Sequence, residues 1–201
     1  MAQEFRKRQE EEELIRRYEE DLKHSQSEFF DIDSYETIIG YYLEKSKFKR
    51  ALTAVERALD QYPYSTELFT VKAQVLTNLE RYDEALELLE RSRNLHPLDL
   101  EIYLSIGSIL SLQGKYEAAI ALYEETLSFA EEDKDEIYYN IGLAYQSMEK
   151  YEQAIEMYKQ SIEINLSHEG SLYELAFCLD VVEQLEGSLS YYKKFIDEDP
   201  Y

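Results

Sequence analysis

The chain has 201 residues, 44% of them hydrophobic, which is enough for a packed core and excludes global disorder. Only 6 Gly and 3 Pro are present, so the residues that a many-turned β protein needs are scarce and helices are favoured. The formal net charge of −22 opposes binding to nucleic acid or to an anionic membrane surface, because both need Lys and Arg to replace counterions.

The negative charge is concentrated in the second half of the chain. Residues 100–201 carry 21 acids and 6 bases, a net of −15, whereas residues 34–99 carry 11 acids and 9 bases. One interpretation is a solvated surface that promotes solubility. The other is a C-terminal half that attracts a basic partner segment.

The sequence of the first region, residues 1–31, predicts a charged helix over 4–23. The linker HSQSEFFD, residues 24–31, follows it. A narrow apolar stripe runs along the helix. One interpretation is a cap that covers the first unit of the following domain, and the other is a coiled-coil or partner-binding arm. In the linker, we expect Phe29 and Phe30 to lie beneath that first unit.

From residue 32 onward, one phrase recurs with a period of 34 residues and one unit of 35. It reads ERYDEALELLERSR, then GKYEAAIALYEETL, then EKYEQAIEMYKQSI. Each unit contains two patterns of apolar residues spaced three and four apart, which is typical of two amphipathic helices. Self-similarity at this period predicts stacked helix pairs. The five units are 32–65, 66–99, 100–134, 135–168 and 169–201.

Two columns of the repeat have a steric meaning. A small residue recurs in the first helix of a unit, where it lets the second helix approach closely. An aromatic residue begins most second helices, and we expect it to fill the angle between the two helices of a pair. The small column contains Ala73, Gly107, Gly142 and Ala176; the aromatic column contains Phe48, Tyr82, Tyr116 and Tyr151.

These columns resemble the tetratricopeptide repeat (TPR) family, most clearly in YLSIGSIL…GKYEAAIALY and YYNIGLAY…EKYEQAIEMY. The resemblance covers residues 32–201. It implies an all-α fold, a right-handed superhelical solenoid of antiparallel helix pairs. The chain stops at DEDPY, where a sixth unit would begin. We expect either a fragment of a longer array or a homodimer formed through the uncovered last repeat.

The resemblance also implies a concave groove, lined by the first helices, that binds a partner peptide or helix. Its lining changes from polar to aromatic along the chain, which favours a partner protein or peptide with apolar anchors and basic flanks. Such aromatics also pack between helices, and that alternative stays open. The groove residues are predicted to be Glu36, Thr70, Gln74, Leu104, Ser108, Tyr139, Asn140, Leu143, Tyr173 and Phe177.

Some TPR proteins bind the carboxylate tail of a chaperone with a clamp of Lys, Arg and Asn. The corresponding positions here include Glu36, Thr70 and Leu104, and none of them is basic. An acidic tail would meet no cation, so the sequence disfavours this co-chaperone role.

No catalytic, cofactor-binding or metal-binding motif is found. The three His fall in a linker and in two turns between repeats, where we expect them to be exposed. The acidic run at residues 131–136 lacks the Gly and the alternating oxygen ligands of a calcium loop. Cys178 is surrounded by apolar residues and is interpreted as a small buried hydrophobe. We therefore expect no enzyme, no cofactor and no metal.

The most direct hypothesis is a protein-interaction scaffold that works by groove recognition. A self-assembling structural module is one alternative, and the TPR part of a larger enzyme or regulator is another. A single cysteine excludes an internal disulfide, and no signal peptide or run of 18 apolar residues occurs. We therefore expect a cytoplasmic protein.

Overall fold

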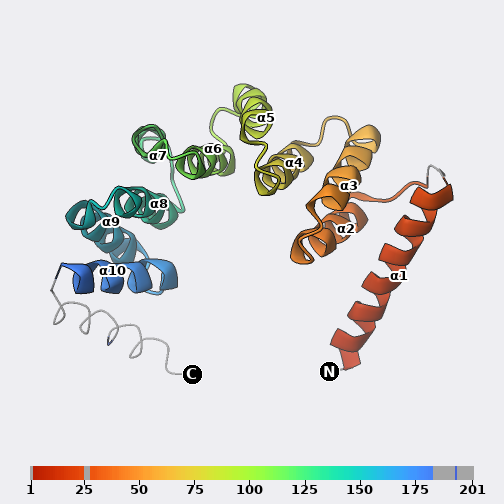
Figure 1. Ribbon diagram of the computed structural model, residues 1–201, viewed down its shortest axis with the longest axis horizontal. Helices are drawn as coiled ribbons and strands as arrows, with labels where there is room; N and C mark the ends of the chain where they lie inside the picture. Colours follow the sequence, from red (N-terminus) through yellow and green to blue (C-terminus); the bar gives the residue numbers. More distant parts are fainter. Residues whose placement is uncertain (1, 25–27, 183–192, 194–201) are drawn as a thin grey trace. The chain divides into compact units, whose positions relative to one another are not determined.

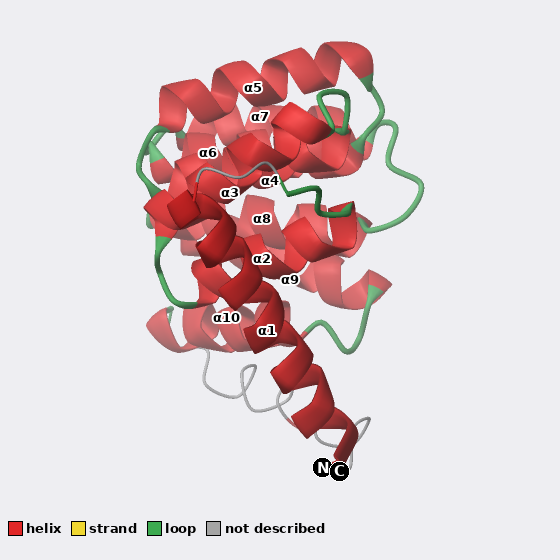
Figure 2. Cartoon of the chain, turned by 90° about the vertical axis from the view of Figure 1, so that its right-hand side faces the viewer, coloured by secondary structure: helices red, strands yellow, loops and turns green. Residues whose placement is uncertain are grey.

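The computed structural model describes residues 2–24, 28–182 and 193. These described residues form ten helices joined by short turns, with no strand among them (Figures 1 and 2). The chain divides into two compact units, residues 1–92 and 93–201, and the boundary falls in the last turn of α5. The fold is an all-α helical-repeat solenoid.

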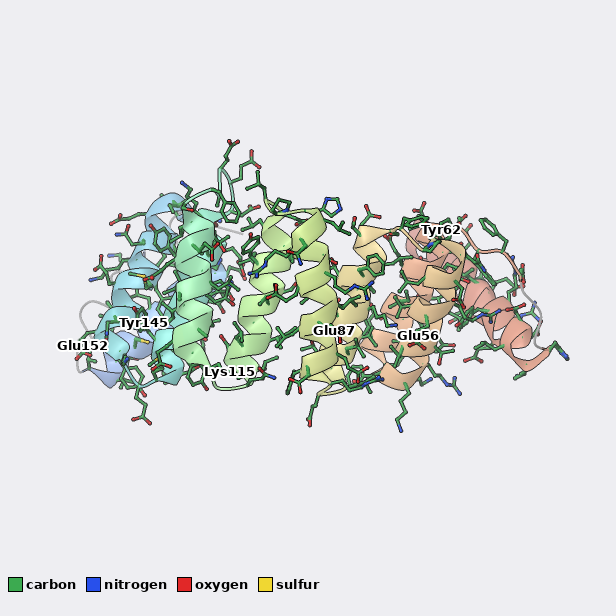
Figure 3. The ribbon with its side chains drawn as sticks, turned by 90° about the horizontal axis from the view of Figure 1, so that it is seen from above. Glu56, Tyr62, Glu87, Lys115, Tyr145 and Glu152 are labelled. Atoms are coloured by element: carbon green, nitrogen blue, oxygen red, sulfur yellow. The ribbon has the colours of Figure 1, made fainter. Side chains whose placement is uncertain are left out.

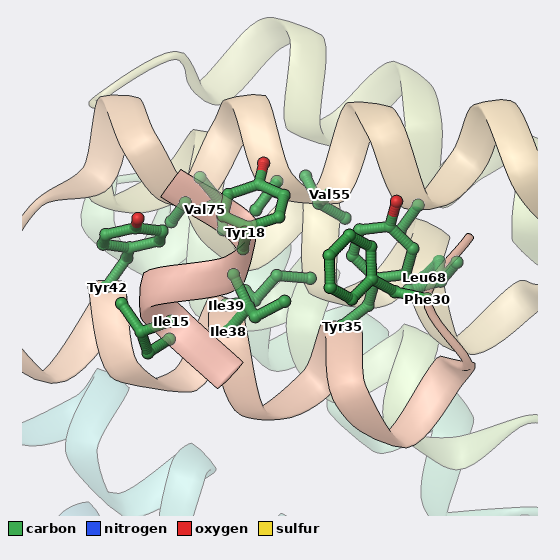
Figure 4. Close-up of a cluster of buried hydrophobic side chains, with 13 residues drawn as sticks. Ile15, Tyr18, Phe30, Tyr35, Ile38, Ile39, Tyr42, Val55, Leu68 and Val75 are labelled. Carbon is green, nitrogen blue, oxygen red and sulfur yellow. The ribbon is translucent and has the colours of Figure 1, made fainter. Parts of the chain in front are cut away.

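Unit 1 contains α1 (Ala2–His24), α2 (Ile32–Glu44), α3 (Phe48–Gln61), α4 (Thr66–Asn78) and most of α5 (Tyr82–Leu95). Its core is built around Tyr18 of α1, which packs among aromatic and aliphatic side chains of α2 and α3 (Figure 4). The ring of Tyr18 meets those of Phe30 and Tyr35 edge-on, with centroids 5.8 and 6.4 Å apart. Burial of apolar area by these aromatic rings holds α1 against the first repeat.

Polar contacts also hold α1 in place. Asp21 is only 2% exposed and pairs with Arg57 of α3, while its Oδ1 accepts from the backbone N–H of Glu28 at 3.0 Å. A buried carboxylate needs such partners, because an unpaired one is costly away from water. In the linker, Phe30 is buried as expected, but Phe29 is 68% exposed and contacts only the ring of Tyr62 among the aromatic pairs of the described residues.

Unit 2 contains α6 (Leu100–Leu112), α7 (Tyr116–Leu127), α8 (Lys134–Ser147), α9 (Tyr151–Ile164) and α10 (Glu169–Val181). One cluster of buried side chains joins α7 and α8, and another joins α9 and α10. The first helices α6, α8 and α10 contact one another in sequence, as stacked helix pairs require. The second helix predicted for the fifth repeat, 169–201, lies outside the described residues.

The turns inside the helix pairs share one geometry. Ser46, Glu80, Gly114 and Glu149 have φ values of 53°, 59°, 73° and 58°, at spacings of 34, 34 and 35 residues. In each turn two backbone N–H groups bond back to the end of the first helix, for example Lys115 N to Leu110 O at 2.9 Å. This is the Schellman ending of a helix. Lys115 lies at this turn, at the lower edge of Figure 3.

The first helices begin with side-chain caps at equivalent positions. Asp31, Ser65 and Asp99 each accept a hydrogen bond from a backbone N–H in the first turn of the helix that follows. Asp133 has a positive φ of 55° and makes no such bond. In the fifth repeat the equivalent position is occupied by His168, which caps α10 through Nδ1. Such caps satisfy N–H groups that have no partner inside the helix.

The aromatic column packs against the cores without being fully buried. Tyr116 and Tyr151 are only half-buried, because they sit in the first turn of their helices near the end of each pair. The tyrosines that fill the space between paired helices come seven residues later. Tyr123 and Tyr158 are 1% and 0% exposed, and each lies over a glycine of the first helix.

Candidate partner-binding surface

The ten predicted groove residues lie on the first helices of their units, and none of them is fully buried. Three belong to unit 1. Glu36 of α2 and Gln74 of α4 are exposed, and half-buried Thr70 donates its hydroxyl to Thr66 O in its own helix at 3.4 Å. These side chains offer polar contacts only.

The remaining seven belong to unit 2. On α6, Ser108 is exposed, while half-buried Leu104 packs against the core between α7 and α8. On α8, Asn140 is occupied by its own helix, since its Nδ2 donates to the Glu136 backbone O at 2.8 Å and to the Glu136 Oε1 at 3.1 Å. These residues form the edge of the surface rather than its centre.

Tyr139 and Leu143 of α8 are half-buried and pack against the core between α9 and α10. The centroid of the Tyr139 ring lies 4.9 Å from that of His168 and 6.0 Å from that of Tyr158. The same ring also closes over Gly170, where a Cβ would approach within 2.9 Å. Packing therefore accounts for both side chains, as the alternative in the sequence analysis allowed.

The exposed aromatics are on α10. Tyr173 is 63% exposed and Phe177 is 46% exposed. Val181, which the sequence analysis did not single out, is 44% exposed and continues the row at the same spacing of four. Three large apolar side chains at i, i+4 and i+8 form one stripe along a helix. We call Tyr173, Phe177 and Val181 the α10 stripe.

His168 is a structural residue, although its position in a turn between repeats predicts an exposed histidine. Its side chain is only 12% exposed. Nδ1 accepts from the backbone N–H of Ser171 at 3.0 Å, and Nε2 lies 3.1 Å from Glu136 Oε2. The ring thus links α8 to the start of α10. Its place in the repeat, where other units carry Asp or Ser, was the available signal.

A partly buried network of polar side chains links α8, α9 and α10. The amide oxygen of Gln146 accepts from the hydroxyl of Tyr158 at 2.7 Å and from the thiol of Cys178 at 3.1 Å, while its nitrogen donates to Glu174 at 2.8 Å. Cys178 is buried as predicted, and burial raises the pKa of its thiol to about 11. The thiol therefore stays protonated and remains a donor at neutral pH.

The surface is negatively charged. Helices α8 and α10 together carry five acids, Asp135, Glu136, Glu169, Glu174 and Asp180, and one base, Lys134. The pKa of the Tyr139 phenol is raised, first by burial and then by the negative charges of Glu174 and Glu136. Apolar side chains within an acidic frame can contact a ligand that is both apolar and cationic.

Within residues 2–24, 28–182 and 193, no group of three His, Cys, Asp or Glu side chains is arranged to hold a metal ion. None of the helices in that same part of the chain is both long enough and apolar enough to cross a membrane.

Family models identify the repeat. The tetratricopeptide repeat model matches residues 64–132 and 100–167, more than half of the chain. The chain belongs to the tetratricopeptide repeat family. Residues 21–92 also match the model of anaphase-promoting complex, cyclosome, subunit 3. A sequence search among curated proteins gives no match.

Solved TPR structures share the fold. A crystal structure of MamA is 21% identical, with a TM-score of 0.62, over 85% of this chain and 95% of that one. MamA 41–end from Desulfovibrio magneticus RS-1 is 20% identical, with a TM-score of 0.61, over 81% and 92%. PilF of Pseudomonas aeruginosa is 22% identical, with a TM-score of 0.66, over 83% and 76%. Likeness at these identities concerns the fold alone.

TPR arrays in general serve as scaffolds for protein–protein interaction, and this TPR protein has the repeat fold of such a scaffold. Membership of the family does not specify which residues of the array contact a partner. That depends on the side chains that each array leaves exposed.

Proposed function

We propose that this TPR protein binds a partner protein through the first-helix surface of unit 2, centred on the α10 stripe. The observation that carries the proposal is the exposure of Tyr173 and Phe177, at 63% and 46%. Folding normally buries such side chains, and contiguous exposed aromatics are typical of interaction sites. Leu104, Ser108 and Asn140 contribute the polar and apolar edge of the same surface.

The proposed partner is a basic peptide or helix with apolar anchors. Acids outnumber bases on α8 and α10 by five to one, and no base lies on α10. Lys or Arg flanks would pair with Glu169 and Asp180, which are exposed, while the anchors cover the stripe. Glu36, Thr70 and Gln74 belong to unit 1, and the proposed surface of unit 2 does not include them.

The proposed scaffold acts in the cytoplasm, without catalysis or cofactor, and residues 32–201 form its five-repeat domain behind the N-terminal region 1–31. The fully buried, protonated thiol of Cys178 is consistent with a reducing compartment. The exposed stripe also supports a homodimer as the second candidate, since a second copy could cover the same apolar side chains.

A pull-down from the native organism with quantitative mass spectrometry tests the proposal. The bait is the wild type beside Y173S/F177S, with circular dichroism to show that both are folded. Tyr139 is left intact, because its ring packs against His168 and its loss would disturb α10. The matched control is Y64S/L98S, which removes two apolar side chains that are 91% and 73% exposed elsewhere.

The expected result is a protein captured by the wild type and the control but lost with Y173S/F177S. Isothermal titration with peptides from that protein then identifies the bound segment, which should be basic. A partner retained equally by all three baits would overturn the proposed surface. Light scattering over a concentration series tests the homodimer separately. If the stripe forms a dimer interface, Y173S/F177S should have a lower mass than the wild type at the same concentration.

A further inference from the structure

The turn between α2 and α3 is positively charged, although the chain as a whole is acidic. Residues 44–50 read EKSKFKR, with four cations among seven residues in a chain of net charge −22. All four cations, Lys45, Lys47, Lys49 and Arg50, are exposed. Two carboxylates lie near them: Glu44 in the same turn and Glu19 of α1, whose Oε1 pairs with Arg50 at 2.7 Å.

The three lysines lack such a partner among the described residues, and two of them share one aromatic ring. The ammonium groups of Lys45 and Lys47 lie 6.0 and 5.8 Å from the centroid of Tyr41. The ring attracts both cations through its negative face. The ring thereby holds both ammonium groups close to the same turn.

We propose that this segment, which we call the basic turn (Tyr41, Lys45, Lys47 and Lys49), is a second interaction surface that takes an acidic peptide segment. Carboxylates of such a peptide would pair with exposed ammonium groups that have no carboxylate partner among the described residues. The half-buried Tyr41 fixes the position of two of the cations, which lowers the entropy lost when the peptide binds. The surface belongs to unit 1, and its charge is opposite to that of the acidic side chains on α8 and α10.

The charge of the rest of the chain favours a short acidic segment over a polyanion. Electrostatic attraction to the basic turn is screened over about 8 Å at physiological ionic strength. A peptide confined to the turn stays within that range. A nucleic acid duplex or an anionic membrane extends beyond it and meets the acids that give the chain its net charge of −22.

Fluorescence anisotropy of the full chain with a short, fluorescein-labelled, glutamate-rich peptide tests the proposal. The wild type is expected to bind with an affinity that falls as salt is raised. K45E/K47E/K49E is expected to weaken binding by more than about tenfold, because three favourable charge pairs become repulsive. Y41L is expected to weaken it less, since the lysines remain but their anchoring ring is lost.

The matched control is K115E/K134E/K150E, which changes the net charge equally but leaves the basic turn intact, and it should retain most of the binding. If charge reversal reduces the circular dichroism signal, K45Q/K47Q/K49Q replaces it and should still reduce binding. Equal loss in the control and in the turn variant would overturn the proposal. So would the absence of peptide binding, or turn-dependent binding of duplex DNA or phosphatidylserine vesicles in its place.

Discussion

The ring of Tyr123 on α7 occupies the space that a side chain at Gly107 of α6 would need. A Cβ built on Gly107 would lie within 2.7 Å of the Tyr123 hydroxyl oxygen and still closer to two ring carbons. Gly142 and Tyr158 repeat this arrangement in the next helix pair. In the second repeat the equivalent positions, 34 residues earlier, hold Ala73 and Leu89, so a larger residue on the first helix accompanies a smaller one on the second helix.

This complementarity predicts a strong coupling between Gly107 and Tyr123. G107A should destabilise by about 1–3 kcal/mol, because the fully packed ring cannot move aside without strain. Y123L alone should cost about 2 kcal/mol through the cavity it leaves. In G107A/Y123L the two costs should partly cancel, since the pair then matches Ala73 and Leu89. Urea unfolding of the four proteins gives the coupling energy, and additive costs would contradict the argument.

The left-handed residues in the turns predict a stabilising substitution. Glu149 has a φ of 58°, a conformation that costs a residue with a Cβ about 1 kcal/mol or more relative to glycine. E149G should therefore raise the free energy of unfolding by about 1 kcal/mol, less the entropy glycine gains in the unfolded chain. The control is E156G, at an exposed position in the interior of α9, which should destabilise by a similar amount. Thermal unfolding by circular dichroism compares the two.

The cap of α10 predicts a specific ranking of variants at residue 168. H168A removes the acceptor for the N–H of Ser171 and the contact with Glu136, and should destabilise by about 1 kcal/mol or more. H168N keeps a capping oxygen and should recover part of that loss. Hydrogen exchange of the first turn of α10 would report the local effect. Equal exchange in the two variants would show that the histidine does not act as a cap.

Burial of Cys178 predicts a loss of stability at alkaline pH. The folded thiol has its pKa raised from 9.0 to about 11. The stabilisation by the neutral thiol is complete below pH 9 and is lost as pH rises from the unfolded value through the folded one. Buried tyrosines whose phenol pKa is also raised, Tyr18 and Tyr123 among them, add to the loss above pH 10.

C178A isolates the contribution of the thiol. Its free energy of unfolding should fall less steeply than that of the wild type between pH 9 and 11, although it starts lower because of the missing sulfur. Urea titrations at several pH values measure both slopes. Identical slopes would mean that the thiol titrates alike in the folded and unfolded chains.

The sequence by itself determined the elements of this protein and their spacing. Apolar residues three and four apart specify helices, and the 34-residue period places Ser46, Glu80, Gly114 and Glu149 at equivalent turns. These features are local or strictly periodic, so a linear pattern contains them. The small column and the burial of Cys178 could be predicted from the sequence for the same reason, because both follow from local or periodic patterns.

Only the tertiary structure decided what each aromatic residue does. Tyr139 and Tyr173 occupy the same position in successive repeats, yet one packs under the His168 cap and the other is 63% exposed. The periodic pattern treats them alike, because burial depends on neighbours from other helices rather than on spacing along the chain. The surface available to a partner follows from that difference in neighbours, which no single segment of the sequence encodes.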